Sequence, residues 1–143
     1  MKLMKHFGLA QILAAVIAIV GIATALEANA YERISNRENR VRVDVVPVQL
    51  EFGKSAKFEI RMNTHSGDLS QDLVSVSTLK DDNGREYRPV DWQGAPPGGH
   101  HRTGVLEFKA LSGNAKSVTL VIRNVADVPE RIFKWNLKEL HLP

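Results

Sequence analysis

Hydrophobic and polar side chains alternate along several short stretches of this chain, which is the pattern of β-strands with one buried face and one wet face. The alternation is clearest at Phe58, Ile60 and Met62, where charged residues occupy the positions between. Glycine, proline and asparagine separate these stretches, as expected of turns. Seven strands are predicted, over residues 41–52, 58–64, 74–79, 86–92, 102–109, 118–125 and 133–137.

Short antiparallel strands with turn residues between them are the sequence signature of an immunoglobulin-like β-sandwich. The chain is therefore predicted to be all-β, with a hydrophobic signal or anchor helix before the sandwich. Pro47 interrupts the first strand and indicates an edge strand, because proline cannot donate to a sheet ladder. Asn83-Gly84 predicts a hairpin turn. A short helical turn is expected over 68–73, with Ser66 as its N-cap.

The N-terminal segment, residues 1–30, has the pattern of an export signal. Two lysines precede an apolar run over residues 7–26, and Ala28-Asn29-Ala30 fits a cleavage site. The run is nearly as long as the roughly 20 residues that span a bilayer, so a retained membrane anchor is the alternative to cleavage. In either case the rest of the chain is expected outside the cytoplasm, periplasmic or secreted, and attached to the membrane only if the segment is uncleaved.

The rest of the chain divides into three parts by composition. Residues 31–40 are polar and rich in charge and are interpreted as a linker. Residues 41–137 carry the strands of the sandwich, and residues 138–143 are interpreted as a C-terminal tail. A length of 143 residues with 43% hydrophobic content suits one domain of ordinary size.

Composition and missing motifs exclude several classes of protein. The net charge is only +3 and no basic stripe is present, which argues against nucleic-acid binding. The chain has no cysteine, which excludes disulfides, thiolate metal sites and thiol catalysis. Motifs for a nucleophile elbow, a zinc protease or a phosphate loop are lacking. We therefore expect a non-catalytic protein; hydrolysis by His65 with Asp68 or Asp72 is a further alternative without an evident nucleophile.

Candidate chemistry is concentrated in the Pro/Gly-rich stretch 91–102, which contains His100 and His101. In an immunoglobulin-like topology the second and fifth strands are antiparallel neighbours. His65 and His101 are therefore expected as cross-strand neighbours on the outward face at one end of the sandwich. Histidines with a carboxylate and no thiolate suit copper or zinc. We predict a metal site formed by His65 and His101, with His100 and Asp68 as additional candidate ligands.

Two other interpretations of the same stretch stay open. His100 has the opposite parity to His101, so it is expected to pack inward unless the Gly98-Gly99 bend turns it outward. In one alternative, the histidines only brace the Pro/Gly loop of a structural or protein-interaction module of the cell envelope. In the other, the Gly98-Gly99 amides bind an anion together with His101 and Arg102.

Two elements of the sequence also match a shared pattern. Residues Thr64-His65-Ser66-Gly67-Asp68-Leu69 fit T-H-S-x-D-L, and residues 98–108 fit G-G-H-H-R-x-G-x-L-x-F. In both, the chain resembles small exported prokaryotic immunoglobulin-like domains of unknown function, over about residues 41–137. The resemblance implies an extracytoplasmic module of that fold, and it implies no activity or cofactor.

Overall fold

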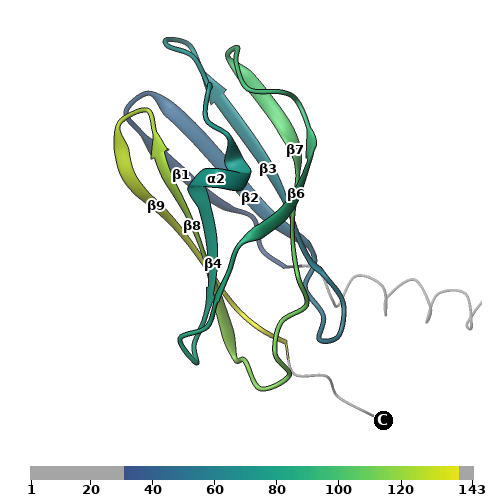
Figure 1. Cartoon of the computed structure of the whole chain (residues 1–143). Coiled ribbons are helices and arrows are strands. Elements are labelled where there is room, and N and C mark those ends of the chain that lie inside the picture. The colour runs from purple at the N-terminus through teal and green to yellow at the C-terminus, as the bar shows by residue number, and fades with distance from the viewer. Residues whose placement is uncertain (1–30, 139–143) are drawn as a thin grey trace, which may run out of the picture. The chain divides into compact units, whose positions relative to one another are not determined.

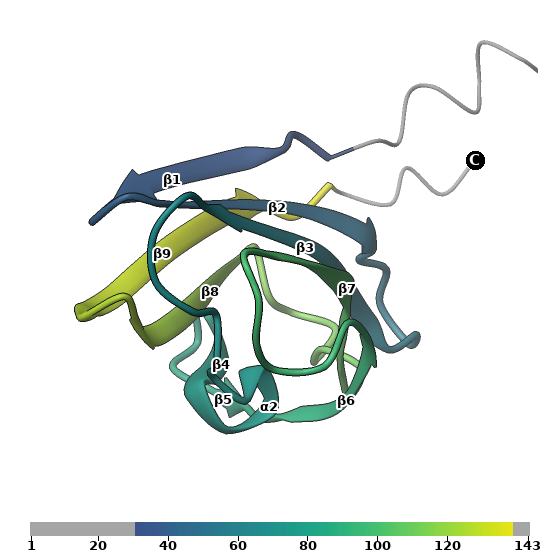
Figure 2. The ribbon, with the colours of Figure 1, turned by 90° about the horizontal axis from the view of Figure 1, so that it is seen from above.

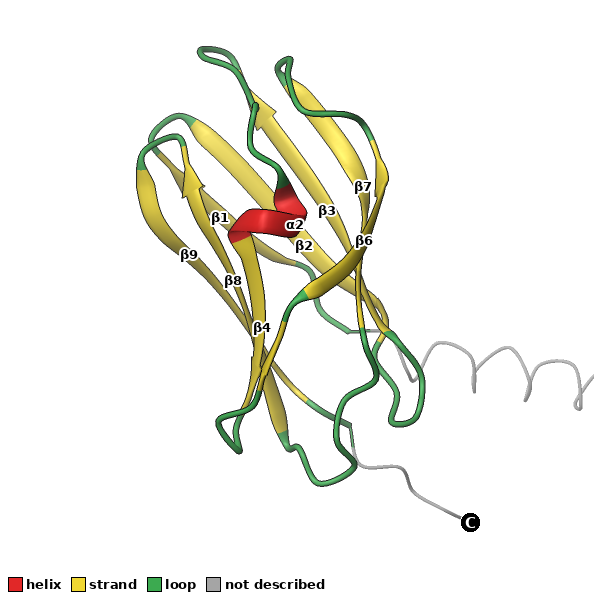
Figure 3. Cartoon of the chain, viewed as in Figure 1, coloured by secondary structure: helices red, strands yellow, loops and turns green. Residues whose placement is uncertain are grey.

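Two antiparallel β-sheets form the fold of residues 31–138, the part of the chain that this computed structural model describes (Figures 1 and 3). The first sheet has the strand order β1-β2-β3-β7-β6, and the second has the order β5-β4-β8-β9. The prediction of an all-β chain is confirmed. The strands are β1 (Ile34–Glu38), β2 (Val41–Gln49), β3 (Ala56–Thr64), β4 (Ser77–Asp81), β5 (Glu86–Tyr87), β6 (Pro89–Gly94), β7 (His101–Phe108), β8 (Ser117–Val125) and β9 (Val128–Asn136).

Side chains from both sheets meet in a continuous apolar core. Phe58 on β3 and Leu106 and Phe108 on β7 are fully buried, as their alternation with polar residues predicted. Phe58 meets Phe108 edge to face, with ring centroids 5.8 Å apart. Trp135 of β9 packs on the same ring at 5.4 Å. A chain without cysteine therefore fills the space between its sheets with aromatic rings.

The strand expected over residues 86–92 is divided between the two sheets (Figure 2). Tyr87 of β5 pairs with Leu79 of β4 in one sheet, whereas β6 pairs with β7 in the other. The chain changes sheet at Arg88-Pro89, because proline lacks the N–H that a continuing ladder needs. The described residues therefore contain nine strands, where the sequence predicted seven.

One strand lies in the segment that was expected to be a polar linker. β1 pairs with β2 from Ile34↔Val45 to Glu38↔Val41, and Ile34 packs against the core. Most side chains of β1 are polar, so the hydrophobic pattern does not reveal it. β2 is consequently an inner strand, and the prediction of an edge strand is wrong. Pro47 is tolerated there because it lies beyond Val45, where the pairing with β1 has ended.

The helical turn lies later in the chain than the sequence predicted. Within the described residues it is α2 (Leu73–Val76), which connects β3 to β4. Asp72, not Ser66, is the N-cap and accepts a hydrogen bond from the Val74 amide at 3.0 Å. The Ser75 hydroxyl, followed by the Val74 amide, lowers the pKa of Asp72 from its ordinary value. The helical turn α2, capped by Asp72, therefore occupies residues that were predicted to begin the third strand.

Both ends of the described chain lie at the same end of the sandwich (Figure 1). The Tyr31 hydroxyl donates to the Leu50 carbonyl at 3.3 Å and accepts from the Lys138 amide at 3.2 Å. The tips of the β1–β2 and β8–β9 hairpins lie at the opposite end, together with the loop after β3 and the loop before β7.

The expected export signal or anchor, residues 1–30, lies outside the described residues, as do residues 139–143 of the expected tail. Across residues 31–138, no helix is both long enough and apolar enough to cross a membrane.

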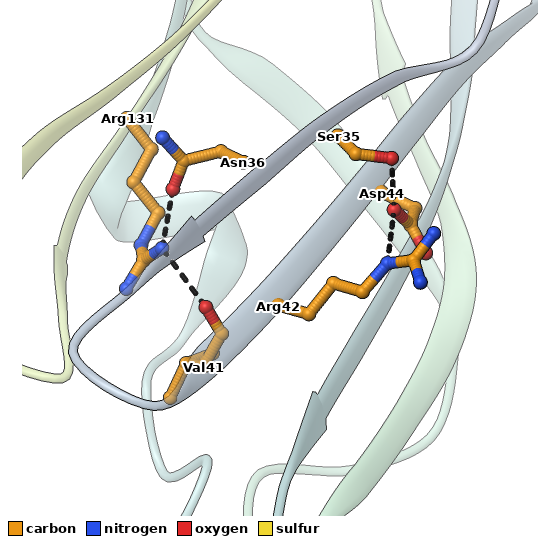
Figure 4. Close-up of polar contacts among 6 residues, drawn as sticks. All are labelled: Ser35, Asn36, Val41, Arg42, Asp44 and Arg131. Atoms are coloured by element: carbon orange, nitrogen blue, oxygen red, sulfur yellow. Dashed lines mark hydrogen bonds and ion pairs between the residues drawn. The ribbon is translucent and has the colours of Figure 1, made fainter.

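Arg131 of β9 joins the two sheets near the hairpin tips, and it is fully buried (Figure 4). Its guanidinium donates to one side-chain amide oxygen and three main-chain carbonyls: Asn36 Oδ1, Glu38 O at 3.0 Å, Val41 O at 3.3 Å and Val125 O at 3.2 Å. Burial lowers the pKa of Arg131, and the nearby Glu38 carboxylate opposes that shift. A buried charge is thus compensated by oxygen atoms of β1, β2 and β8.

Replacing Arg131 with alanine should lower the free energy of unfolding by about 3 kcal/mol or more, because it opens a cavity and leaves buried oxygens without donors. Arg131→Met restores most of the volume without the hydrogen bonds, so it should recover only part of the loss. Urea unfolding measures both. Lys134→Ala, on the exposed face of the same strand, is the control and should change stability by less than about 0.5 kcal/mol. Full recovery in the methionine variant would contradict the role given to the hydrogen bonds.

Candidate functional site

The pairing of β3 with β7 brings the two sequence elements of the candidate site together. The Thr64 amide donates to the His100 carbonyl at 3.0 Å. Leu69 exchanges two further bonds, donating to Gly99 O at 3.0 Å and accepting from Gly98 N at 2.8 Å. We call residues 64–72 and 95–101 the histidine loops. They form one hydrogen-bonded unit at the end of the sandwich away from Tyr31.

The register of this pairing differs from the expected one. His101 is paired with Asn63, and its Nδ1 lies 2.7 Å from Asn63 Oδ1. His65 follows the last paired position of β3, so it does not face His101 directly as the sequence predicted. Both histidines are exposed, as the parity of their strands predicted. Alternation determines the face on which a side chain lies, whereas the register depends on turns and bulges elsewhere in the sheet.

The side chain of His100 is exposed, so of the two alternatives the outward turn at the Gly98-Gly99 bend holds and inward packing does not. Gly98 and Gly99 both adopt positive φ, at 117° and 76°, and this bend turns the chain before β7 begins. The imidazoles of His65 and His100 make no hydrogen bond to any other side chain or carbonyl within residues 31–138. Within those residues, the one hydrogen bond of a histidine ring is that between His101 and Asn63.

Arg102 fills the inward position next to the histidine pair and is only 2% exposed. It donates to carbonyls of both histidine loops: Leu69 O at 3.1 Å, Gln71 O at 2.6 Å and Ala95 O at 3.4 Å. The Trp92 ring lies over the guanidinium, with the centroid 5.6 Å from Cζ. Burial lowers the pKa of Arg102, and the Asp72 carboxylate opposes the shift. This side chain therefore holds the two histidine loops together.

The interpretation of the glycine bend as an anion site is wrong. The Gly99 amide donates to Asp68 Oδ1, and the Gly98 amide donates to the Leu69 carbonyl. Arg102, the proposed cation, is buried against main-chain carbonyls. The carboxylate held at this bend is thus one of the protein's own, and Asp68 tethers one histidine loop to the other.

The described residues contain no group of three or more histidine, cysteine, aspartate or glutamate side chains placed to hold a metal ion. Of the four residues predicted as ligands, His65, His100 and His101 are exposed on the histidine loops. The fourth, Asp68, is hydrogen-bonded to the Gly99 amide through one oxygen. The structure thus brings the predicted residues to one end of the sandwich without assembling a closed set of ligands.

A pocket of about 480 Å³ opens beside the histidine loops. Its walls come from the turn at residues 39–40, from segment 64–69 and from the turn at 126–127. Arg40 and Asp127 belong to this pocket and were not singled out from the sequence. The available signal was weak, because each is one charged residue in a turn, and only the fold places the two turns side by side.

No family model, curated protein or solved structure gave a significant match to this chain.

Replacing Asp68 with alanine should release the glycine bend while leaving the sandwich folded. Hydrogen exchange of the Gly99 amide should become about five times faster, because a hydrogen bond worth about 1 kcal/mol is lost. Asp68→Asn keeps an acceptor oxygen and should restore much of the protection. Asp91→Ala on β6 is the control, since its side chain contacts Gln93 and not the histidine loops. Unchanged exchange at Gly99 in Asp68→Ala would contradict the tether.

Proposed function

We propose that this chain is an exported, non-catalytic binding module of immunoglobulin-like topology, and that its ligand surface is the end carrying the histidine loops. The strand order supports the topology. The order β2-β3-β7-β6 against β5-β4-β8-β9 has the same succession as strands A-B-E-D against C′-C-F-G of an immunoglobulin domain, with β1 as an addition. By this correspondence, the histidine loops and the turn at 126–127 are the B–C, D–E and F–G connections, of which B–C and F–G belong to the binding end of variable domains.

The observation that carries the proposal is that one set of residues fixes the histidine loops and another set is exposed and available to contact a ligand. Arg102 and Asp68 supply the bonds that fix the loops. His65 and His100 are exposed and have no side-chain bond within the described residues. Imidazoles on a rigid support and without a bracing task favour ligand contact over a purely structural role. The rival is a structural or protein-interaction module of the cell envelope.

A transition metal, copper or zinc, is the ligand we propose for His65 and His101, with His100 as a third imidazole from the same unit. His101 Nδ1 faces Asn63 Oδ1, so the proton belongs on Nδ1 and Nε2 keeps the lone pair that a metal binds. Copper and zinc both accept imidazole ligands, and water completes sites in which the protein supplies few. Asp68, with one oxygen bonded to Gly99, is the candidate carboxylate.

Tyr31 lies at the end of the sandwich opposite the histidine loops. If residues 1–30 stay in a membrane, the module is attached to the membrane through the chain before Tyr31; if they are removed, it is a periplasmic or secreted domain.

Metal binding is tested by thermal unfolding of the full chain with and without Cu(II) or Zn(II). At a metal concentration about 100 times Kd, the melting temperature should rise by about 5 °C or more. The double variant His65→Ala/His101→Ala should lose this rise. His6→Ala/His141→Ala removes two histidines outside the described residues and should keep it. No rise with either metal would reject the metal ligand, and a less stable metal-free H65A/H101A variant would favour the bracing role.

Export is tested by the mass of the chain recovered from the extracytoplasmic fraction of a bacterial host. Cleavage after Ala30 should yield a chain that begins at Tyr31. Ala28→Leu/Ala30→Leu enlarges both small residues of the cleavage motif and should leave the full-length chain in the membrane fraction. Recovery of full-length, unmodified protein from the cytoplasm would contradict the proposal of an exported module.

A further inference from the structure

The pocket beside the histidine loops contains two opposite charges that remain unpaired. The Arg40 guanidinium and the Asp127 carboxylate make no ion pair or hydrogen bond with any residue of 31–138. They nevertheless lie on neighbouring turns, because the side-chain Nδ2 of Asn39 donates to the Ala126 carbonyl at 3.0 Å. Opposite charges that are close in space but unpaired leave both groups available to a molecule that contacts each of them.

Both turns have a defined backbone conformation. Asn39 and Arg40 have φ of 47° and 63°, and Ala126 and Asp127 have φ of 53° and 58°. Two successive left-handed residues are the mark of the tight type I′ hairpin, whose twist matches that of the strands. The left-handed conformation is unfavourable for arginine and alanine, so the hairpin geometry holds them in it. Tight two-residue turns therefore form two of the pocket walls.

Two apolar residues of the pocket lining are held in place by buried arginines. Val41 and Leu69 are 2% and 1% exposed and line the pocket. The Val41 carbonyl accepts from Arg131, and the Leu69 carbonyl accepts from Arg102, so each buried arginine anchors one lining residue. Aliphatic and hydroxyl side chains make up half of the lining, Asn39 and Asp68 are also among the lining residues, and the lining holds no aromatic ring on which a sugar or a base stacks. The volume of about 480 Å³ is that of a site for a small molecule.

We propose that this pocket binds a small zwitterion of the α-amino-acid class. The carboxylate of the ligand pairs with Arg40, its ammonium group pairs with Asp127, and its side chain lies in the pocket between them. The proposal rests on the assignment of this end of the sandwich as a ligand surface. The proposed contacts use none of the three histidines and do not use Asp68, which also lines the pocket, so leucine binding and metal binding are tested separately.

Calorimetric titration of the full chain in mild detergent with L-leucine tests the proposal. Two blocked analogues of leucine test the two ionic contacts separately. Leucine should bind, whereas N-acetylleucine, without the ammonium group, and leucinamide, without the carboxylate, should each bind about tenfold more weakly. Arg40→Gln should weaken leucine about tenfold and leave leucinamide unchanged. Asp127→Asn, which suits a left-handed residue, should weaken leucine and leave N-acetylleucine unchanged.

Arg85→Gln is the matched control, because Arg85 is an exposed arginine in a hairpin turn at the opposite end of the sandwich. It should leave the affinity for leucine unchanged. The absence of leucine binding at millimolar concentrations would overturn the proposal, as would equal affinity for leucine and N-acetylleucine, which indicates a simple anion site. A metal-induced rise in melting temperature without leucine binding would reject this pocket alone, whereas failure of both would reject the ligand surface.

Discussion

Two buried guanidinium groups determine how one end of this sandwich is built. A charge removed from water must recover its hydrogen bonds inside the protein. Arg102 and Arg131 recover theirs mainly from main-chain carbonyls, not from carboxylates. Those carbonyls belong to the segments that form the candidate site. The loops must therefore lie where their carbonyls can accept hydrogen bonds from the two arginines.

The same arrangement gives the histidine loops a rigid support and leaves their imidazoles exposed. Arg102 reaches the loop after β3 and the loop before β7, and Asp68 adds a bond to the Gly99 amide. Trp92, itself half-buried, covers the guanidinium from the side of β6. A site supported in this way meets a ligand with little reorganisation, which favours affinity because less conformational entropy is lost on binding.

Arg131 supports the two hairpin turns of the pocket in the same way, through hydrogen bonds to main-chain carbonyls. It bonds to carbonyls on both sides of the β1–β2 turn and to the last residue of β8. The metal ligands that we propose and the zwitterion pocket are thus adjacent features of one end, each resting on one buried arginine. The opposite end, where Tyr31 and Lys138 meet, carries the connection to the rest of the chain.

The sequence alone determined the all-β class, the inward faces of β3 and β7, the hairpin at Asn83-Gly84 and the exposure of His65 and His101, because a period of two is a local property of a strand. Tertiary structure decided the rest. The register that pairs His101 with Asn63 depends on the whole sheet, and β1 is nearly all polar. Arg102 already had the inward parity, yet its burial is possible only through carbonyls about thirty residues away, at Leu69 and Gln71. Partners so distant in sequence leave no periodic signal, so only the folded chain reveals what organises the stretch around His100 and His101.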